Sequence, residues 1–266
     1  MRPINTNNAE LDAANAQMFR VLGDLKKVVH QRDAAHDEMI ERHFDSMYLL
    51  ALGADIRQGR EPTRLARVGA TAEILAQAVG ISREVCEMIR KAAPLHDIGM
   101  VAIPDDILLK DGELGTEEWL LWRGHTEIGS RILSRAVDTP LMRLASEIAL
   151  THHEAFNGRG YPGNLAGEAI PLSGRIVAVA DYLQTHMPVA LDGNGSSMRW
   201  AILETMPAMR GIRFDPGVVD LLPGSLGAID EACELIRQEA RTFEGLLATG
   251  KPSIHRNVAD TWVKGQ

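Results

Sequence analysis

The residues best suited to chemistry in this chain are histidines and aspartates that recur at regular intervals through its middle. Successive groups are 27 to 28 residues apart, and the set is His96, Asp97, His125, His152, His153 and Asp181. Iron, manganese and zinc accept imidazole and carboxylate groups of proteins as ligands. Two adjacent ligand pairs, a lone histidine and a late aspartate could fill a two-metal site, which would activate a water and clamp a phosphoryl group.

Asp181 is the most informative of these residues after the His96-Asp97 pair. It interrupts the apolar run at residues 176–180. An isolated carboxylate is costly to bury, so this one needs a partner, and a cation is a natural one. His125 alone would be interpreted as a core histidine, and two adjacent histidines alone are weak evidence. The joint pattern therefore carries the metal-site prediction.

A turn-rich loop follows the histidine pair and is the candidate substrate-binding segment. It contains Gly158, Arg159, Gly160, Tyr161 and Pro162. These residues are also ordinary turn formers. The loop could therefore be only a turn, or it could present backbone N–H groups and Arg159 to a phosphate or a base, and the spacing leaves both interpretations open.

The elements that must position these residues are predicted to be helices. Apolar residues recur at helical spacing, and the expected helices cover residues 44–58, 63–79, 82–93, 116–135, 140–153, 173–186 and 229–248. Gly80 is expected to end the second of them, and Ser82 and Thr116 to cap two others. Because no alternating strand pattern occurs, the chain is predicted to be all-α.

The N-terminal arm, residues 1–48, is predicted to be a helix with a heptad seam. Apolar residues alternate in steps of three and four, interrupted by Arg32, in the series Leu11, Ala14, Met18, Val21, Leu25, Val28, Arg32, Ala35 and Met39. The arm could pack on its own domain, or it could form a coiled coil with a second chain, and the pattern favours the second alternative. We expect the main domain to span residues 49–248 and a polar tail to follow at 249–266.

Composition limits the class of protein. The net charge of −8 argues against a general DNA- or RNA-binding surface. The lone cysteines, Cys86 and Cys233, argue against a disulfide scaffold. No apolar run approaches the ~20 residues that span a bilayer, and no signal peptide is visible at the N-terminus. The expected location is therefore the cytoplasm.

Residues from about 49 to 225 resemble the HD-GYP family, a subgroup of the HD metal-dependent phosphohydrolases. The resemblance is carried by many motifs in the same order, namely residues 96–99 (HDIG), 103–105 (IPD), 107–110 (ILLK), 125–129 (HTEIG), 152–154 (HHE), 157–162 (NGRGYP), 170–172 (IPL), 175–181 (RIVAVAD) and 214–216 (FDP).

The resemblance implies an HD-domain helical bundle with divalent ions, usually iron or manganese, that hydrolyses cyclic di-GMP to pGpG or GMP. It implies that His96, Asp97, His125, His152, His153 and Asp181 are metal ligands, with His96 and Asp97 catalytic, and that residues 158–162 line the substrate groove. It also implies a homodimer through a helical stalk and a signalling partner protein.

The chain departs from the family pattern at three places. Arg64 stands where the family has a histidine ligand and Arg60 where it often has a glutamate, so we expect one or two ions. Met100 replaces a lysine after the HD motif, and residues 182–188 lack the family's aspartate and basic stretch. Arg60 and Arg64 could neutralise the carboxylates of the site, which is the preferred interpretation, or bind the substrate phosphate.

Two functions follow as hypotheses. The first is a cyclic di-GMP phosphodiesterase whose activity is reduced by these departures. The second is a degenerate HD-GYP domain that senses a nucleotide or binds a protein without hydrolysis.

Overall fold

The computed structural model describes residues 5–186 and 204–240, with side chains from residue 11 onward. The chain divides into two compact units, Met1–Phe44 and Asp45–Gln266. The predicted boundary between residues 48 and 49 stays a prediction. The polar tail at 249–266 and the predicted end of the last helix at 241–248 lie outside the described residues.

Helix α1, Asn5–Arg57, begins in the first unit and ends in the second. The sequence predicted a helical arm at 1–48 and a helix at 44–58, and the structure joins them into one helix of 53 residues. The apolar side chains of the predicted seam are exposed, including Leu11, Met18, Val21, Leu25, Val28 and Met39. At the seam's polar position, Arg32 donates to its neighbour Asp33.

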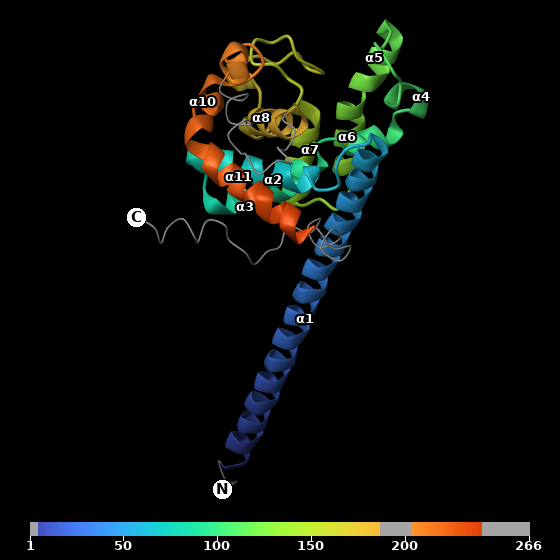
Figure 1. Ribbon diagram of the computed structural model, residues 1–266. Helices are drawn as coiled ribbons and strands as arrows, with labels where there is room; N and C mark the ends of the chain where they lie inside the picture. The colour runs from blue at the N-terminus through green and yellow to red at the C-terminus, as the bar shows by residue number, and fades with distance from the viewer. Residues whose placement is uncertain (1–4, 187–203, 241–266) are drawn as a thin grey trace. The chain divides into compact units, whose positions relative to one another are not determined.

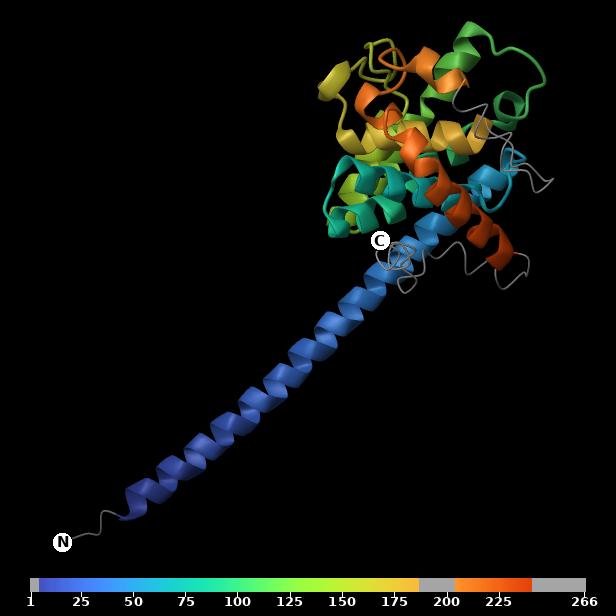
Figure 2. The same cartoon turned by 60° about the vertical axis from the view of Figure 1, so that its left-hand side comes forward.

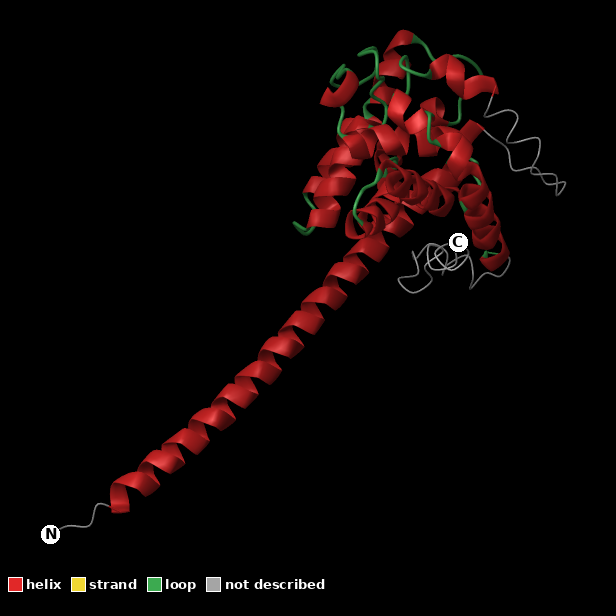
Figure 3. Ribbon diagram, turned by 90° about the vertical axis from the view of Figure 1, so that its left-hand side faces the viewer, coloured by secondary structure: helices red, strands yellow, loops and turns green. Residues whose placement is uncertain are grey.

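Helices joined by loops make up the described residues of the second unit, without a strand among them, which confirms the all-α prediction (Figure 3). Its further elements, labelled in part in Figure 1, are α2 (Arg64–Val79), α3 (Arg83–Ala92), η1 (Ala93–Leu95), η2 (Ile98–Ala102), α4 (Asp105–Leu108), α5 (Thr116–Arg123), α6 (His125–Ser134), α7 (Pro140–Thr151), η3 (Gly167–Ala169), α8 (Leu172–His186), α10 (Pro216–Val219) and α11 (Leu222–Glu239). The β-type pairing in the described residues is limited to two isolated bridges, between Asn157 and Ala166 and between Arg210 and Phe214.

Helix α2 lies at the centre of this bundle. It packs against α3, α8 and α11, and Figure 2 shows α11 in orange-red crossing the bundle. The side chains of Val68, Ala72, Leu75 and Ala76 are fully buried along α2. Burial of such an apolar stripe is the main source of stability for a helix of this length. Helix α2 is therefore held in place by its buried face, and so are the residues at its N-terminal end.

Several helix ends match the predicted signals and others do not. Gly80 ends α2 with a left-handed φ of 93°, as predicted. Ser82 stands at the N-cap of α3 but makes no side-chain hydrogen bond there. The predicted cap at Thr116 is wrong, because the N-cap is Gly115, whose N–H donates to Glu118 at 2.7 Å. The predicted helix 116–135 is broken at Gly124, which separates α5 from α6.

None of the helices in the described ranges is both long and apolar enough to span a membrane.

Candidate metal centre

The predicted ligands come from four separate parts of the bundle. His96 and Asp97 lie between η1 and η2, and His125 begins α6. His152 and His153 directly follow α7, and Asp181 lies in α8. The structure brings all six together.

Gly99 permits the close approach of two of these segments. A Cβ atom at position 99 would lie 1.9 Å from the carbonyl oxygen of His125, a distance that no side chain tolerates. The glycine of the His-Asp-x-Gly motif therefore lets η2 lie directly against the start of α6, which places Asp97 beside His125.

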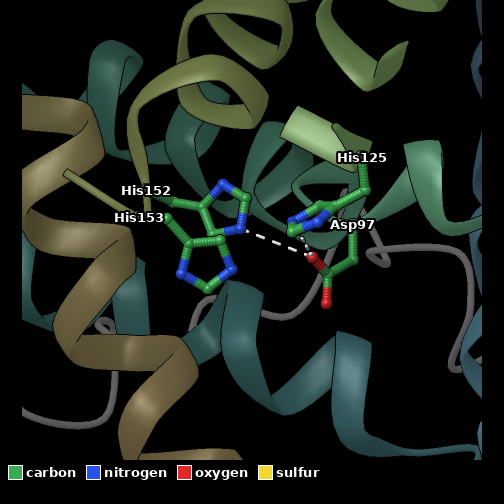
Figure 4. Close-up of side chains that lie close together, drawn as sticks. All are labelled: Asp97, His125, His152 and His153. Carbon is green, nitrogen blue, oxygen red and sulfur yellow. Dashed lines mark ion pairs between the residues drawn. The ribbon is translucent and has the colours of Figure 1, made fainter. Parts of the chain in front are cut away.

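The Oδ1 atom of Asp97 faces two imidazoles. It lies 3.3 Å from Nε2 of His125 and 3.4 Å from Nε2 of His152 (Figure 4). With His153, these residues offer four ligand atoms that all lie within 4.8 Å of one another. Asp97, His125 and His152 are buried and His153 is partly buried.

The orientation of the imidazoles determines which ring nitrogen faces the cluster when a ring is neutral. The Nδ1 atoms face backbone carbonyls, in the pairs His96 with Ala93 at 2.7 Å, His125 with Trp122 at 2.7 Å and His152 with Ala149 at 3.1 Å. A carbonyl only accepts, so Nδ1–H donates and a neutral ring presents a lone pair at Nε2. Such a bond to the other ring nitrogen is typical of metal-binding histidines.

The inner atoms of this cluster fit a divalent cation. Nε2 of His96, His125 and His152 and Oδ1 of Asp97 are buried without a hydrogen-bond partner in the described part of the chain. Lone pairs that face a carboxylate oxygen at 3.3 to 3.4 Å repel it unless a proton or a cation lies between them. The cluster therefore has the donor set and the bare acceptors of a divalent metal site.

The Oδ2 side of Asp97 has different neighbours. Nε2 of His96 lies 3.4 Å from Asp97 Oδ2 and 3.4 Å from Asp181 Oδ1. Nη1 of Arg60 donates to Asp97 Oδ2 at 3.0 Å, and Nη1 of Arg64 donates to Asp181 Oδ1 at 2.6 Å. Two guanidinium groups therefore contact the carboxylates on this side.

Asp55 in α1 is a member of the site that was not predicted from the sequence. Its carboxylate accepts hydrogen bonds from Nε of Arg64 at 3.1 Å and from Nη2 at 2.5 Å. The signal was available, because Asp55 interrupts the apolar run at 49–54 just as Asp181 interrupts its own run.

The charges of the cluster favour ligand-competent states. Burial opposes ionisation, but His96 holds the pKa of Asp97 well below its usual range, and His96 and Arg64 do the same for Asp181. Burial lowers the pKa of His152, and burial with the neighbouring His152 lowers that of His153 well below its usual range. Ionised carboxylates and neutral imidazoles are the forms that bind cations. His96 differs, because Asp97 and Asp181 outweigh the effect of burial and raise its pKa to about 10.

Glu154 organises the glycine loop beside the cluster. It is buried, and its carboxylate accepts hydrogen bonds from the backbone N–H groups of Gly163 at 2.6 Å and Leu165 at 3.0 Å. Gly160 approaches Glu154 so closely that a Cβ atom there would lie 2.5 Å from its backbone. The sequence shows Glu154 only as the last residue of the HHE motif and did not predict its structural role.

Tyr161 is the loop residue that contacts the histidines. Its ring stacks on His153 at a centroid distance of 4.9 Å, and the guanidinium of Arg123 lies 4.8 Å above it. The backbone N–H of Gly158 donates to the carbonyl of Ala155 at 2.8 Å, and that of Arg159 donates to the side chain of Asn157 at 3.0 Å, so these hydrogen bonds are local.

Comparison with known proteins gives the class of this chain. The HD domain family matches residues 51–218. The chain is 40% identical over 189 residues to 3'3'-cGAMP-specific phosphodiesterase 2 of Vibrio cholerae. The matched segment covers 70% of this chain and 35% of that protein. It is 38% identical over 200 residues to the cyclic di-GMP phosphodiesterase response regulator RpfG of Xanthomonas campestris. That match covers 75% of this chain and 52% of RpfG. The chain belongs to the HD domain family, and within it to the HD-GYP group.

A third relative and a solved structure agree with this assignment. The chain is 35% identical over 231 residues to a cyclic di-GMP phosphodiesterase of Thermotoga maritima, with 82% of this chain and 62% of that protein covered. The crystal structure of a cyclic GMP-AMP specific phosphodiesterase of V. cholerae matches with a TM-score of 0.55 at 17% identity, covering 78% of this chain and 53% of that one, which shows the shared fold. The chain thus spans about one third to two thirds of the length of these curated relatives.

Proposed function

We propose that this chain is a metal-dependent phosphodiesterase that hydrolyses a cyclic dinucleotide, with cyclic di-GMP as the first candidate and pGpG or GMP as products. The observation that carries the proposal is the cluster of Asp97 with His125, His152 and His153, in which three inner atoms have no hydrogen-bond partner in the described part of the chain, namely Oδ1 of Asp97 and Nε2 of His125 and of His152. The names of the relatives, which are cyclic di-GMP and 3'3'-cGAMP phosphodiesterases, support the substrate class.

The cofactor in this proposal is a divalent ion, iron or manganese, held by Asp97, His125, His152 and His153. When bound, such an ion activates water and stabilises charge on phosphoryl oxygens. The protein's own residues fix the positions of the ligands. Backbone carbonyls orient the imidazole rings, and Gly99 lets Asp97 reach His125. The other two predicted ligands, His96 and Asp181, lie on the Oδ2 side of Asp97.

The substrate side of the proposed site is the loop at 158–162. Tyr161 is its best-supported member, because its ring covers His153 and could stack against a base. Arg123, held over Tyr161, and Arg159, which is exposed in the loop, supply positive charge near a substrate that is anionic. Gly158, Gly160 and Pro162 shape the backbone that presents them.

Hydrolysis by the metal-loaded protein tests this proposal. Purified chain loaded with Mn(II) or Fe(II) under reducing conditions is expected to convert cyclic di-GMP, or 3'3'-cGAMP as the second substrate, to linear products resolved by chromatography. Asp97→Asn should abolish the turnover, whereas Asp106→Asn, at an exposed aspartate, should leave it intact. Absence of turnover of both nucleotides by the loaded wild-type protein would contradict the proposal.

A degenerate binding module is the second candidate function. It is favoured by one observation, the contact of Arg60 and Arg64 with the carboxylates of Asp97 and Asp181. If this function is correct, calorimetry will detect binding of cyclic di-GMP while no linear product forms. Turnover that disappears in Asp97→Asn would exclude it.

We further propose that the arm at 1–48 joins two copies of the domain at 49–248 and links them to a signalling partner. The exposed apolar seam supports the homodimer. A cytoplasmic location is part of the same proposal, and it is supported by Cys86 and Cys233, which are both free thiols.

A further inference from the structure

We propose that the centre holds a single divalent ion, on the Oδ1 side of Asp97, and that the guanidinium of Arg64 takes the place of a second cation on the Oδ2 side. The inference rests on the proposed function only in assuming that the cluster binds a divalent ion at all.

The first observation is the unequal environment of the two oxygens of Asp97. Oδ1 is buried and has no hydrogen-bond partner among the described residues, although two imidazole nitrogens face it. Oδ2 accepts from Nη1 of Arg60 at 3.0 Å and lies 3.6 Å from Nη2 of Arg64. One oxygen is thus free for a metal ion, and the other already has cationic neighbours.

The second observation is the place of the Arg64 guanidinium between two carboxylates. Nη1 lies 2.6 Å from Asp181 Oδ1, and Nη2 lies 3.6 Å from Asp97 Oδ2. An ion that joined Asp97, Asp181 and His96 would need this same space and would have to take the Asp181 oxygen from Arg64. Guanidinium stays protonated and cannot act as a ligand, so the two cations exclude each other.

The third observation is that Arg64 is held in this position. Nε and Nη2 donate to Asp55, and Nη1 also donates to the hydroxyl of Thr185 at 3.0 Å. The side chain of Arg64 is 3% exposed and that of Asp55 is 1% exposed. All three nitrogens of Arg64 are therefore engaged within the protein, which argues against its use as a ligand for a substrate phosphate.

The net charge of the buried side chains favours the binding of one divalent ion over two. The carboxylates of Asp55, Asp97 and Asp181 are opposed by the guanidiniums of Arg60 and Arg64, which leaves one net negative charge before any positive charge on His96 is counted. Binding of one divalent ion would change this net charge to one positive charge. A second divalent ion would leave three net positive charges in a buried site, where charge repulsion is only weakly screened.

The experiment counts the ions. The full chain is loaded with Mn(II) without oxygen, excess metal is removed, and bound manganese is measured by mass spectrometry together with its electron paramagnetic resonance spectrum. We expect one manganese per chain with the spectrum of an isolated Mn(II). Two ions per chain, an exchange-coupled pair, or no bound ion would overturn the inference.

Two matched variants test the part played by Arg64. Arg64→His replaces the guanidinium with a potential ligand and should raise the content from one toward two ions per chain. Arg67→His changes an equally buried arginine of the same helix, which contacts Glu61 and Gln184, and should stay at one. A folded Arg64→His protein that still binds one ion would contradict the inference, and if that variant does not fold, the wild-type count still decides. A protein with one ion that hydrolyses no cyclic dinucleotide would support this inference and refute the proposed function.

Discussion

Arg64 and Asp55 form a buried ion pair in which two guanidinium nitrogens donate to one carboxylate, at 3.1 Å from Nε and 2.5 Å from Nη2. The pair links the start of α2 to α1 within the second unit and orients Arg64 toward Asp97 and Asp181. It therefore supports the fold and the metal centre together.

Removal of one partner of this pair should be strongly destabilising. Asp55→Ala removes one counterion of Arg64 and leaves its buried Nε and Nη2 groups without their acceptor, and we expect a loss of about 3–5 kcal/mol in the free energy of unfolding, measured with urea. Asp220→Ala removes the partner of Arg210 from an exposed pair and should change stability little. Equal losses of unfolding free energy in the two variants would show that the buried pair stabilises the protein no more than the exposed pair does.

Gly99→Ala should damage both stability and metal binding. The new methyl group would lie 1.9 Å from the carbonyl oxygen of His125, so η2 and α6 must separate. Overpacking of this kind costs about 1–3 kcal/mol or more, and the metal content should fall because Asp97 moves with η2. Gly53→Ala is the control, because it lies in α1 with nothing within 4 Å of the new methyl group. It should stabilise the protein by roughly 0.5–1 kcal/mol. A normal melting temperature and metal content in Gly99→Ala would contradict the account of how Asp97 is placed.

Glu154→Gln should loosen the loop at 160–165. The neutral amide has one acceptor oxygen in place of two, so either Gly163 or Leu165 loses its partner, and the remaining bond loses its charge. Amide hydrogen exchange at these two positions should become faster. Glu168→Gln, at an exposed position in η3, should leave these exchange rates unchanged. Unaltered protection in Glu154→Gln would mean that the loop is held by other contacts.

The seam of the N-terminal arm should determine the oligomeric state. Leu25→Asp places a charge in the middle of the apolar seam and should convert a dimer to a monomer in light scattering coupled to gel filtration. His30→Asp introduces the same side chain away from the seam and should leave the mass unchanged. A wild-type protein that is already monomeric at micromolar concentration would refute the proposed dimer.

Much of this architecture follows from local sequence patterns. The helical class, the C-terminal end of α2 at Gly80 and the meeting of six candidate ligand residues were all predicted, because helical periodicity and residue types that can bind metals are visible in short segments. The break at Gly124 was not, since the apolar pattern on both sides of it continues at helical spacing.

The division of the centre into two unlike halves could not be predicted. It depends on which oxygen of Asp97 faces the histidines and which faces the arginines, and that is decided by residues far apart in the sequence that meet at Asp97 only in the folded chain. The partners of Asp55 and Glu154 could not be predicted from the sequence for a different reason. Their polar character was visible, but only the structure shows that one binds Arg64 and the other binds the loop backbone.

Anomalous scattering from crystals of the Mn(II)-loaded protein tests the central claim most directly, because it locates each ion. The account predicts one peak per chain, in contact with Asp97 Oδ1, Nε2 of His125, Nε2 of His152 and a ring nitrogen of His153. A peak between His96 and Asp181, a second peak in place of the Arg64 guanidinium, or no peak at the cluster would contradict it.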